Sequence, residues 1–238
     1  MAVFVRLTGI AGVVASLFWI LGDALLLGGS TDRAAHPLLR GNPGLADTVG
    51  SLLAPSTDQL MWGALAGVLT APLYLAAVWH LYRGIRPAGR ALAVPPAVAL
   101  AASWAIAPFI HGSFYYWGEA YRAAESLGDD RAGVDRLLAM ADDFSAAISV
   151  AYWVYGILVG LASLWIVVLI VRGRTAYPRW AVPASPGIGL LIGFAVAALL
   201  AGTVFQGAAL SIGHLLTFTL STILLWRRPF LPPSPVHP

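Results

Sequence analysis

Long apolar stretches separated by short polar segments dominate this chain of 238 residues. A helix of about 20 apolar residues crosses the hydrocarbon core of a bilayer, which is about 30 Å thick. Six stretches meet this requirement, at residues 4–29, 58–82, 92–121, 145–171, 187–204 and 208–226. The pattern predicts an all-α polytopic membrane protein, in which residues 1–228 form one compact antiparallel bundle of six transmembrane helices.

The segments around the first two apolar stretches predict the local structure there. The first stretch is longer than the apolar core of a signal peptide and contains Asp23, so we expect an uncleaved helix. Residues 30–57 are polar and predict a long loop, with a short interfacial helix over 45–53. Asp58 is placed to cap the second span by accepting backbone N–H groups. The acidic segment 122–143 predicts a surface helix.

The composition excludes several classes of protein. Only 11% of the residues are charged and 59% are hydrophobic, whereas soluble domains carry roughly 25% charged residues. All 14 basic residues are Arg, and the absence of Lys excludes a retinal-type Schiff base. The absence of Cys excludes disulfides, thiolate metal sites and Cys nucleophiles. The Arg residues are scattered and the net charge is +3, so we expect membrane lipids as partners and no nucleic acid.

The distribution of Arg predicts the orientation, because cytoplasmic segments are enriched in Arg and Lys. With both termini in the cytoplasm, nine of the 14 Arg residues face it: Arg6, Arg83, Arg86, Arg90, Arg172, Arg174, Arg179, Arg227 and Arg228. All eleven acidic residues then lie on the outer side or in the outer part of a span. We therefore predict a multi-pass protein of the cell (inner) membrane, with a Pro-rich cytoplasmic tail at 229–238.

Three pairs of glycines predict close helix packing. Each pair is spaced four residues apart and therefore lies on one helix face, where it lets a neighbouring helix approach. The pairs are Gly63 with Gly67, Gly156 with Gly160, and Gly189 with Gly193. No internal repeat is visible.

Several ionisable residues fall at similar depth in the outer half of the predicted bundle. At 1.5 Å per residue, Asp23 lies about 9 Å below the outer end of the first span. His111 lies about 12 Å deeper than Glu119, and His214 lies roughly 10 Å from the start of its span. An ionisable side chain at membrane depth is costly and marks a functional site by default. Asp23, His111, His214 and Glu119 are therefore the candidate catalytic residues.

Polar side chains at helical spacing extend this set. His111, Tyr115 and Glu119 share one helix face, and a second stripe contains Ser211, His214, Thr217 and Ser221. The candidate substrate-contacting residues are Tyr115, Tyr116, Asp58, Trp104, Tyr152, Tyr155 and Ser211. A belt of interfacial aromatic residues and ordinary rim charges are the structural alternatives for these positions. His80, in the inner half, is interpreted as an interfacial residue.

Two kinds of chemistry fit the candidate residues. His111, His214 and Asp23 are a possible ligand set for zinc or non-haem iron, and the two histidines for haem. However, the chain has no His-x-x-His or His-Glu-x-x-His motif, so the ligands would come singly from three helices. A metal-free acid/base site is simpler, with a buried carboxylic acid as proton donor and His as base. Serine catalysis is not supported, because no Gly-x-Ser-x-Gly elbow is present.

The segment Arg174–Trp180, followed by Pro186, resembles a hairpin found in uncharacterised bacterial six-span membrane proteins of unknown function. The pair Gly22-Asp23 is similar to theirs as well. This resemblance implies a six-span fold over most of the chain, and it implies no activity or catalytic residues. The His/acid arrangement is similar in kind to that of membrane sterol isomerases and small membrane terpene cyclases, without a residue-by-residue match.

We predict an intramembrane enzyme that isomerises, cyclises or hydrolyses a lipid or isoprenoid-like substrate by acid/base chemistry, without a metal or other cofactor. The alternative is a small-solute or proton-coupled transporter, or a ligand-binding protein, that uses the same cavity. A structural role in a complex is a third reading. Transporters commonly carry repeats with broken helices in both halves, whereas here Pro108 alone interrupts a span deeply. No feature of the sequence indicates the oligomeric state.

Overall fold

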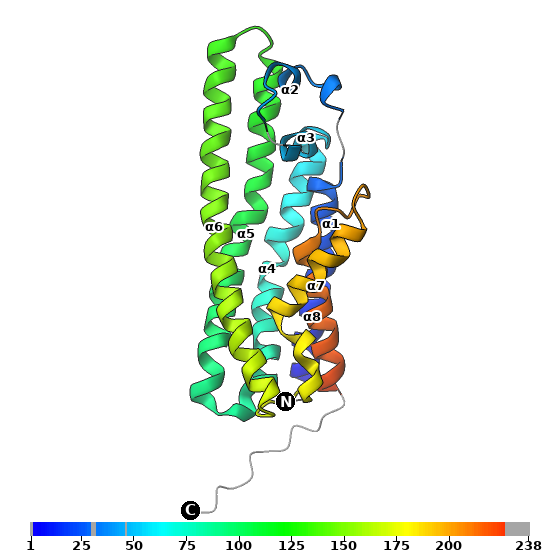
Figure 1. Cartoon of the computed structure of the whole chain (residues 1–238), viewed down its shortest axis with the longest axis vertical. Coiled ribbons are helices and arrows are strands. Elements are labelled where there is room, and N and C mark those ends of the chain that lie inside the picture. The colour runs from blue at the N-terminus through cyan, green and yellow to red at the C-terminus, as the bar shows by residue number, and fades with distance from the viewer. Residues whose placement is uncertain (1, 30–31, 46, 227–238) are drawn as a thin grey trace, which may run out of the picture.

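The computed structural model describes residues 2–29, 32–45 and 47–226, and all regular elements in these ranges are helices. The helices form a tall bundle (Figure 1). We call the end that carries α2 (Pro37–Gly41) and α3 (Asp47–Leu53) the capped end, and the end where the chain starts the N-terminal end. The predicted tail at 229–238 lies outside the described residues.

Six helices form the bundle: α1 (Ala2–Leu27), α4 (Thr57–Ile85), α5 (Arg90–Ser126), α6 (Arg131–Val171), α7 (Pro186–Leu199) and α8 (Ala209–Trp226). Three short 3₁₀ segments accompany the connections: η1 (Arg33–Ala35), η2 (Arg86–Ala88) and η3 (Arg179–Ala184). Among the described residues, five helices are long and apolar enough to cross a membrane. The exception is α7, whose 14 residues extend about 21 Å.

The helical part of the predicted span 187–204 is therefore shorter than expected. The helix ends at Leu199, and Gly202 in the turn after it adopts a φ of +79°, a left-handed conformation that a helix does not contain. The Thr203 hydroxyl donates to the Leu200 carbonyl at 2.7 Å, and the Gly202 N–H donates to the side chain of Gln206 at 3.2 Å. Residues 200–208 thus form a turn, stabilised locally, between α7 and α8.

The predicted separate surface helix over 122–143 was wrong, because these residues belong to the long helices α5 and α6 and to the turn between them. The two helices contain 37 and 41 residues, about 55 and 60 Å, so both exceed the thickness of a bilayer core. They absorb the acidic segment and leave only a turn between Ser126 and Arg131. Gly128 has a φ of +56° in this turn, and Asp130 caps α6 by accepting from the Gly133 N–H at 3.2 Å.

The capping residue of α4 is Ser56 and not Asp58, so that prediction was wrong. The Ser56 hydroxyl accepts from the Gln59 N–H at 3.2 Å, and the Gln59 side chain accepts from the Ser56 N–H at 2.7 Å. This reciprocal capping box satisfies two backbone donors at once. Asp58 lies in the first turn, where its charge still favours the helix.

Two of the three glycine pairs pack against neighbouring helices. A Cβ on Gly63 would lie 3.0 Å from the Gly22 carbonyl of α1, and a Cβ on Gly193 would lie 2.6 Å from the Gly213 nitrogen of α8. Close approach at these points requires glycine. Gly156 and Gly160 are different, because no described atom lies within 4 Å of a Cβ built on either.

A buried polar cluster lies near the N-terminal end, and it corrects the interpretation of His80 as an interfacial residue. His80 is fully buried. Its Nδ1 donates to the Val5 carbonyl at 2.8 Å, so its Nε2 accepts from the Ser221 hydroxyl at 2.9 Å. Tyr177, in the loop before η3, lies 2.7 Å from the same hydroxyl, and burial raises the pKa of Tyr177, which keeps it a donor.

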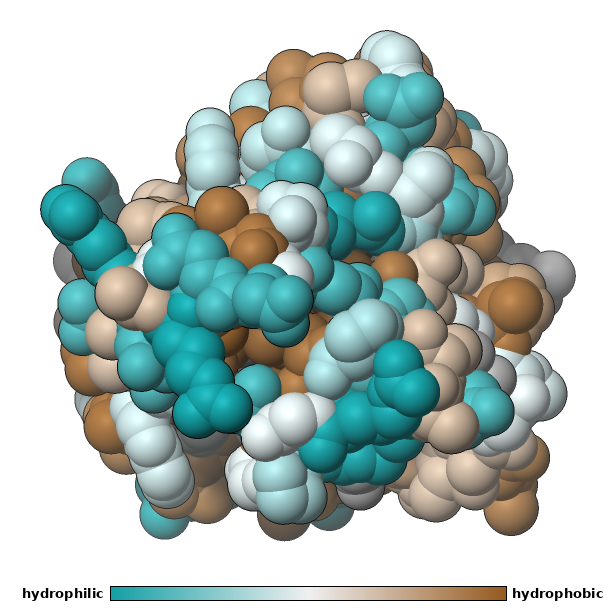
Figure 2. Space-filling model, turned by 90° about the horizontal axis from the view of Figure 1, so that it is seen from above, coloured by the Kyte–Doolittle hydropathy of each residue, from teal (hydrophilic) through white to brown (hydrophobic). Residues whose placement is uncertain are grey.

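The capped end is polar and joined to α5 by a hydrogen bond between His36 and Glu125. His36 Nδ1 lies 2.9 Å from the Glu125 carboxylate, and Arg33 donates to the carbonyls of Pro43 and Leu45 at 3.2 and 3.3 Å. Figure 2 looks onto this end and shows hydrophilic residues over much of it, with hydrophobic residues between them. This end is therefore suited to contact with water.

Candidate functional site

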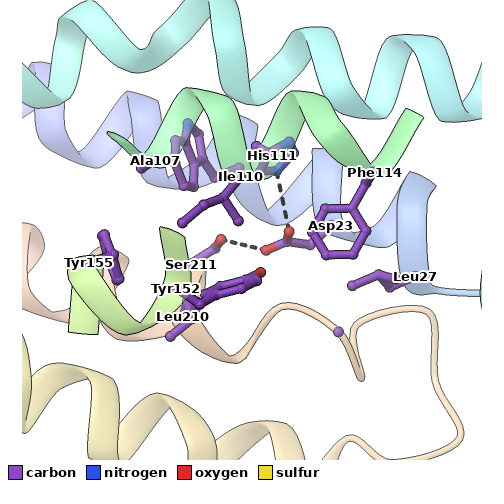
Figure 3. A pocket seen from close by; sticks show the side chains of 12 residues that line it. Asp23, Leu27, Ala107, Ile110, His111, Phe114, Tyr152, Tyr155, Leu210 and Ser211 are labelled. Atoms are coloured by element: carbon purple, nitrogen blue, oxygen red, sulfur yellow. Dashed lines mark hydrogen bonds and ion pairs between the residues drawn. The ribbon is translucent and has the colours of Figure 1, made fainter. Parts of the chain in front are cut away.

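A narrow pocket with a cavity volume of about 40 Å³ lies among α1, α5, α6 and the start of α8. Its lining is mainly apolar and aromatic, with one carboxylate: Trp19, Asp23, Leu27, Ala107, Ile110, His111, Phe114, Tyr152, Tyr155, Gly207, Leu210 and Ser211. Figure 3 shows Asp23 between His111 and Ser211. An apolar pocket with a few convergent polar groups is the usual form of a small-molecule site.

Asp23 is held from two sides. The Ser211 hydroxyl donates to Asp23 Oδ2 at 2.5 Å, and His111 Nε2 lies 3.3 Å from Oδ1. Ser211 is in the first turn of α8, where the free backbone N–H groups of the helix favour a nearby negative charge. The Asp23 side chain remains 14% exposed, so the carboxyl group is accessible from the pocket.

Two glycines position His111. The histidine comes from α5, and its ring lies against Gly22 of α1 and Gly67 of α4. A Cβ on Gly22 would lie 2.8 Å from His111 Cε1, and a Cβ on Gly67 would lie 2.5 Å from Nδ1. The ring thus occupies a slot between α1 and α4 that only glycine leaves open, and this slot directs it toward Asp23.

Polar atoms at the pocket are left without partners. His111 is 4% exposed, yet neither of its ring nitrogens has a hydrogen-bond partner among the described residues, because the contact with Asp23 is close without being aligned. The buried Trp19 Nε1 is unpartnered in the same way. A buried polar group without a hydrogen bond costs about 1–3 kcal/mol. A polar group of a ligand, or water, is suited to satisfy these atoms.

His214 lies deeper than the pocket. It follows Ser211 by three residues on α8, about 4.5 Å along the axis, and does not line the pocket. Its Nε2 lies 2.8 Å from the Tyr155 hydroxyl. Tyr155 does line the pocket, so its hydroxyl is a polar link between His214 and the site. The structure therefore places His214 behind the wall and not on it.

An aromatic layer packs behind Trp19, a residue of the pocket lining, whose ring centroid lies 5.0 Å from that of Tyr74. Tyr74 stacks on Trp104 at a centroid distance of 5.4 Å, and both pack against Phe218, at 5.7 and 5.3 Å. Tyr74, Trp104 and Phe218 are all fully buried. Trp104, a candidate substrate contact, belongs to this layer and is not part of the pocket lining.

The remaining candidate residues lie elsewhere. Glu119 accepts from the Thr57 hydroxyl at 2.9 Å, eight residues along α5 from His111, and Asp58 is exposed. Tyr116 is exposed and lines a separate apolar groove between α5 and α6. The ring of Tyr115 packs against the ring of Tyr116, with 5.2 Å between their centroids. Of the candidates, Asp23, His111, Tyr152, Tyr155 and Ser211 line the pocket.

Sequence reasoning missed the apolar part of the lining, including Trp19, Leu27 and Phe114. Trp19, Asp23 and Leu27 follow one another at intervals of four residues, so the face of α1 that presents Asp23 also presents the other two. The same spacing relates Ile110 to Phe114. This spacing was the available signal.

The structure does not assemble the alternative metal site. Among the described residues, no group of three or more His, Cys, Asp or Glu side chains is placed to hold a metal ion. Trp19 packs against both histidines, with its ring centroid 5.0 Å from that of His111 and 6.4 Å from that of His214. The set of His111, His214 and Asp23 therefore does not fit zinc, and the two histidines do not form a haem site.

Comparison with known proteins places the chain in a family. A family model described as a family of unknown function (DUF6796) matches residues 3–228, so the chain belongs to that family. No curated protein and no solved structure matches the chain.

Proposed function

We propose that this member of a family without an assigned activity is an integral membrane enzyme that performs acid/base chemistry on a lipid or isoprenoid-like molecule. Five helices of sufficient length and apolar character support the membrane setting. We propose that α7 and the turn after it form a sixth crossing, and that the Arg-rich N-terminal end faces the cytoplasm. The pocket then lies in the outer half of the bilayer.

The observation that carries this proposal is the surroundings of the Asp23 carboxyl group. Its carboxyl group is partly exposed to an apolar pocket, receives the Ser211 hydroxyl and lies 3.3 Å from an imidazole. General acid/base catalysis requires such a group within hydrogen-bond reach of the substrate. Asp23 exchanges a proton with the substrate. His111 lies beside the Asp23 carboxyl group and stabilises it in both its acid form and its carboxylate form. Ser211 orients the carboxyl group.

The aromatic layer supports an enzyme over a solute channel. Tyr74, Trp104 and Phe218 are fully buried and pack behind the lining residue Trp19, so solvent does not reach through this part of the bundle. A pocket that is closed on one side holds a substrate in place, so that the substrate can react with Asp23. Solute transport would require this packed layer to open.

One observation favours proton-coupled transport as a second candidate. Ser211, Thr217 and Ser221 are buried on one face of α8 together with His214. This stripe extends about 15 Å from Asp23 toward the His80 cluster. Intramembrane polar chains of this kind relay protons in pumps and transporters. Proton uptake into liposomes carrying the purified protein, compared with a Thr217→Val variant, tests this candidate.

Isotope-labelled water tests the enzyme proposal. The protein is placed in nanodiscs with a total lipid extract, in deuterium oxide or in heavy-oxygen water, and lipids are analysed by chromatography and mass spectrometry. Isomerisation or protonation-initiated cyclisation incorporates deuterium, whereas hydrolysis incorporates heavy oxygen. We expect a labelled lipid with the wild-type protein, strongly reduced with Asp23→Asn. Asp143→Asn, an exposed acid on α6, is the matched control. If no lipid differs between wild type and Asp23→Asn, the proposal is wrong.

A further inference from the structure

Negative charge prevails over positive charge among the residues that line the pocket. Asp23 is the only acidic residue in its lining, and neither Arg nor Lys contributes to it. Among the other lining residues only His111 can carry a positive charge. In a low-dielectric site a single carboxylate has a strong influence on the sign of charge that binds.

The aromatic residues of the lining also favour a positively charged ligand. Trp19, Phe114, Tyr152 and Tyr155 all line the pocket that contains Asp23, and Figure 3 shows Phe114 and Tyr152 beside the carboxyl group. The face of an aromatic ring attracts a cation through its quadrupole, most strongly for Trp, and this attraction grows when water is excluded. Four aromatic side chains and a carboxylate together favour a positive centre.

The pocket is poorly suited to a negative centre. Hydrolysis of an ester or amide passes through an oxyanion, which needs hydrogen-bond donors directed at it. The Ser211 hydroxyl already donates to Asp23, and the carboxylate repels an oxyanion nearby. Besides His111, the free donors among the described lining side chains are the buried Trp19 Nε1 and the Tyr152 hydroxyl, and neither removes the repulsion from Asp23.

The surroundings indicate an apolar body for the ligand. Leu27, Gly207 and Leu210 line the part of the pocket formed by the end of α1 and the turn before α8. The same turn exposes Val204 and Phe205. An apolar chain bound at Asp23 therefore finds apolar contacts along this turn.

We propose that the pocket recognises positive charge at the head of an apolar chain. This inference deepens the proposed function and rests on it for the catalytic part: the substrate is an alkene lipid that reacts through a carbocation. Asp23 in its acid form gives its proton to one alkene carbon, which leaves a carbocation on the other carbon and a carboxylate on Asp23. Loss of a proton from an adjacent carbon to that carboxylate yields the isomer and restores the acid, with no oxidant or reductant.

Binding of a stable cation tests the charge preference. The probe is radiolabelled dodecyltrimethylammonium, bound to the protein in nanodiscs. Empty nanodiscs give the background. Dodecanol and dodecyl sulfate are the competitors, because they carry the same chain with a neutral or negative head. We expect saturable binding that dodecanol displaces at least tenfold less effectively than unlabelled probe, and dodecyl sulfate less effectively still.

Two pairs of variants assign the preference to its source. Asp23→Asn keeps the shape and removes the charge, and we expect binding on the order of tenfold weaker, with Asp143→Asn unchanged. Tyr152→Leu removes a ring and weakens binding several-fold, whereas Tyr152→Phe keeps the ring and binds like wild type. Equal displacement by dodecanol, or unchanged binding by Asp23→Asn, overturns the proposal.

The two proposals fail separately. Selective binding of the ammonium probe, without any lipid labelled by deuterium or heavy oxygen, overturns the enzyme and leaves the charge preference in place. A lipid labelled with heavy oxygen, with no preference for the ammonium probe, overturns the charge preference and leaves acid/base catalysis in place.

Discussion

Replacing Gly67 by Ala tests whether the glycine slot positions His111. The added Cβ would lie 2.5 Å from His111 Nδ1 and 2.7 Å from Cδ2, whereas carbon atoms pack best at about 3.5–4.0 Å. The ring has to move by about 1 Å, and Gly22 limits its movement on the other side. A displacement of this size at a catalytic group costs up to about a hundredfold in rate.

The stability change is the smaller effect. Overpacking typically costs about 1–3 kcal/mol, and replacing Gly by Ala inside a helix returns up to about 1 kcal/mol. The expected net loss is therefore at most about 2 kcal/mol. Thermal unfolding in a mild detergent, followed by tryptophan fluorescence, measures it alongside the rate of deuterium incorporation into lipid.

Gly156→Ala is the matched control. It makes the same substitution in the interior of α6, where no described atom lies within 4 Å of the new Cβ. We expect equal or slightly higher stability and an unchanged rate. If Gly67→Ala behaves like Gly156→Ala in both measurements, the slot does not position His111 and the reasoning is refuted.

Three further substitutions have expected outcomes. Ser211→Ala removes the hydroxyl that donates to Asp23, a hydrogen bond to a charged group worth about 1.5–3 kcal/mol, so deuterium incorporation into lipid should fall roughly tenfold or more, and a wild-type rate contradicts the role of the hydroxyl. Glu119→Gln should leave that rate unchanged, because the carboxylate lies outside the pocket; a large loss there would restore it as a catalytic candidate. Tyr177→Phe should lower the free energy of unfolding by about 1 kcal/mol through loss of its hydrogen bond to Ser221, measured by thermal unfolding, with no change in rate.

Much of the bundle and part of the site could be predicted from the sequence, because hydrophobic periodicity and helix rise are local properties. Counting residues from the ends of the spans put Asp23 and His111 at similar depth, and the structure brings them to 3.3 Å. The polar stripe that begins at Ser211 likewise gave a residue that contacts Asp23. The depth estimate, however, also placed His214 beside Asp23 and His111, whereas in the structure His214 does not line the pocket.

The rest depends on how the helices rotate and pack, which a single sequence does not report. Trp19 looked like any apolar residue of α1, although it lines the pocket. The pair Gly63–Gly67 correctly indicated close packing, but the pattern did not show that Gly67 makes room for His111. Gly156 and Gly160 show the converse, since the same motif there has no neighbour among the described residues.

The hydrogen bonding of two buried histidines separates a structural role from a functional one. His80 uses both ring nitrogens, one toward the Val5 carbonyl and one toward Ser221, as expected of a polar residue that holds helices together. His111 uses neither among the described residues, although it is nearly as buried and lies beside a carboxyl group that faces a pocket. Native structures rarely leave such groups unsatisfied without a reason. The sequence predicted His80 as an interfacial residue and His111 as a catalytic candidate. In the structure both are buried, and the partners of their nitrogens direct the search for function to His111.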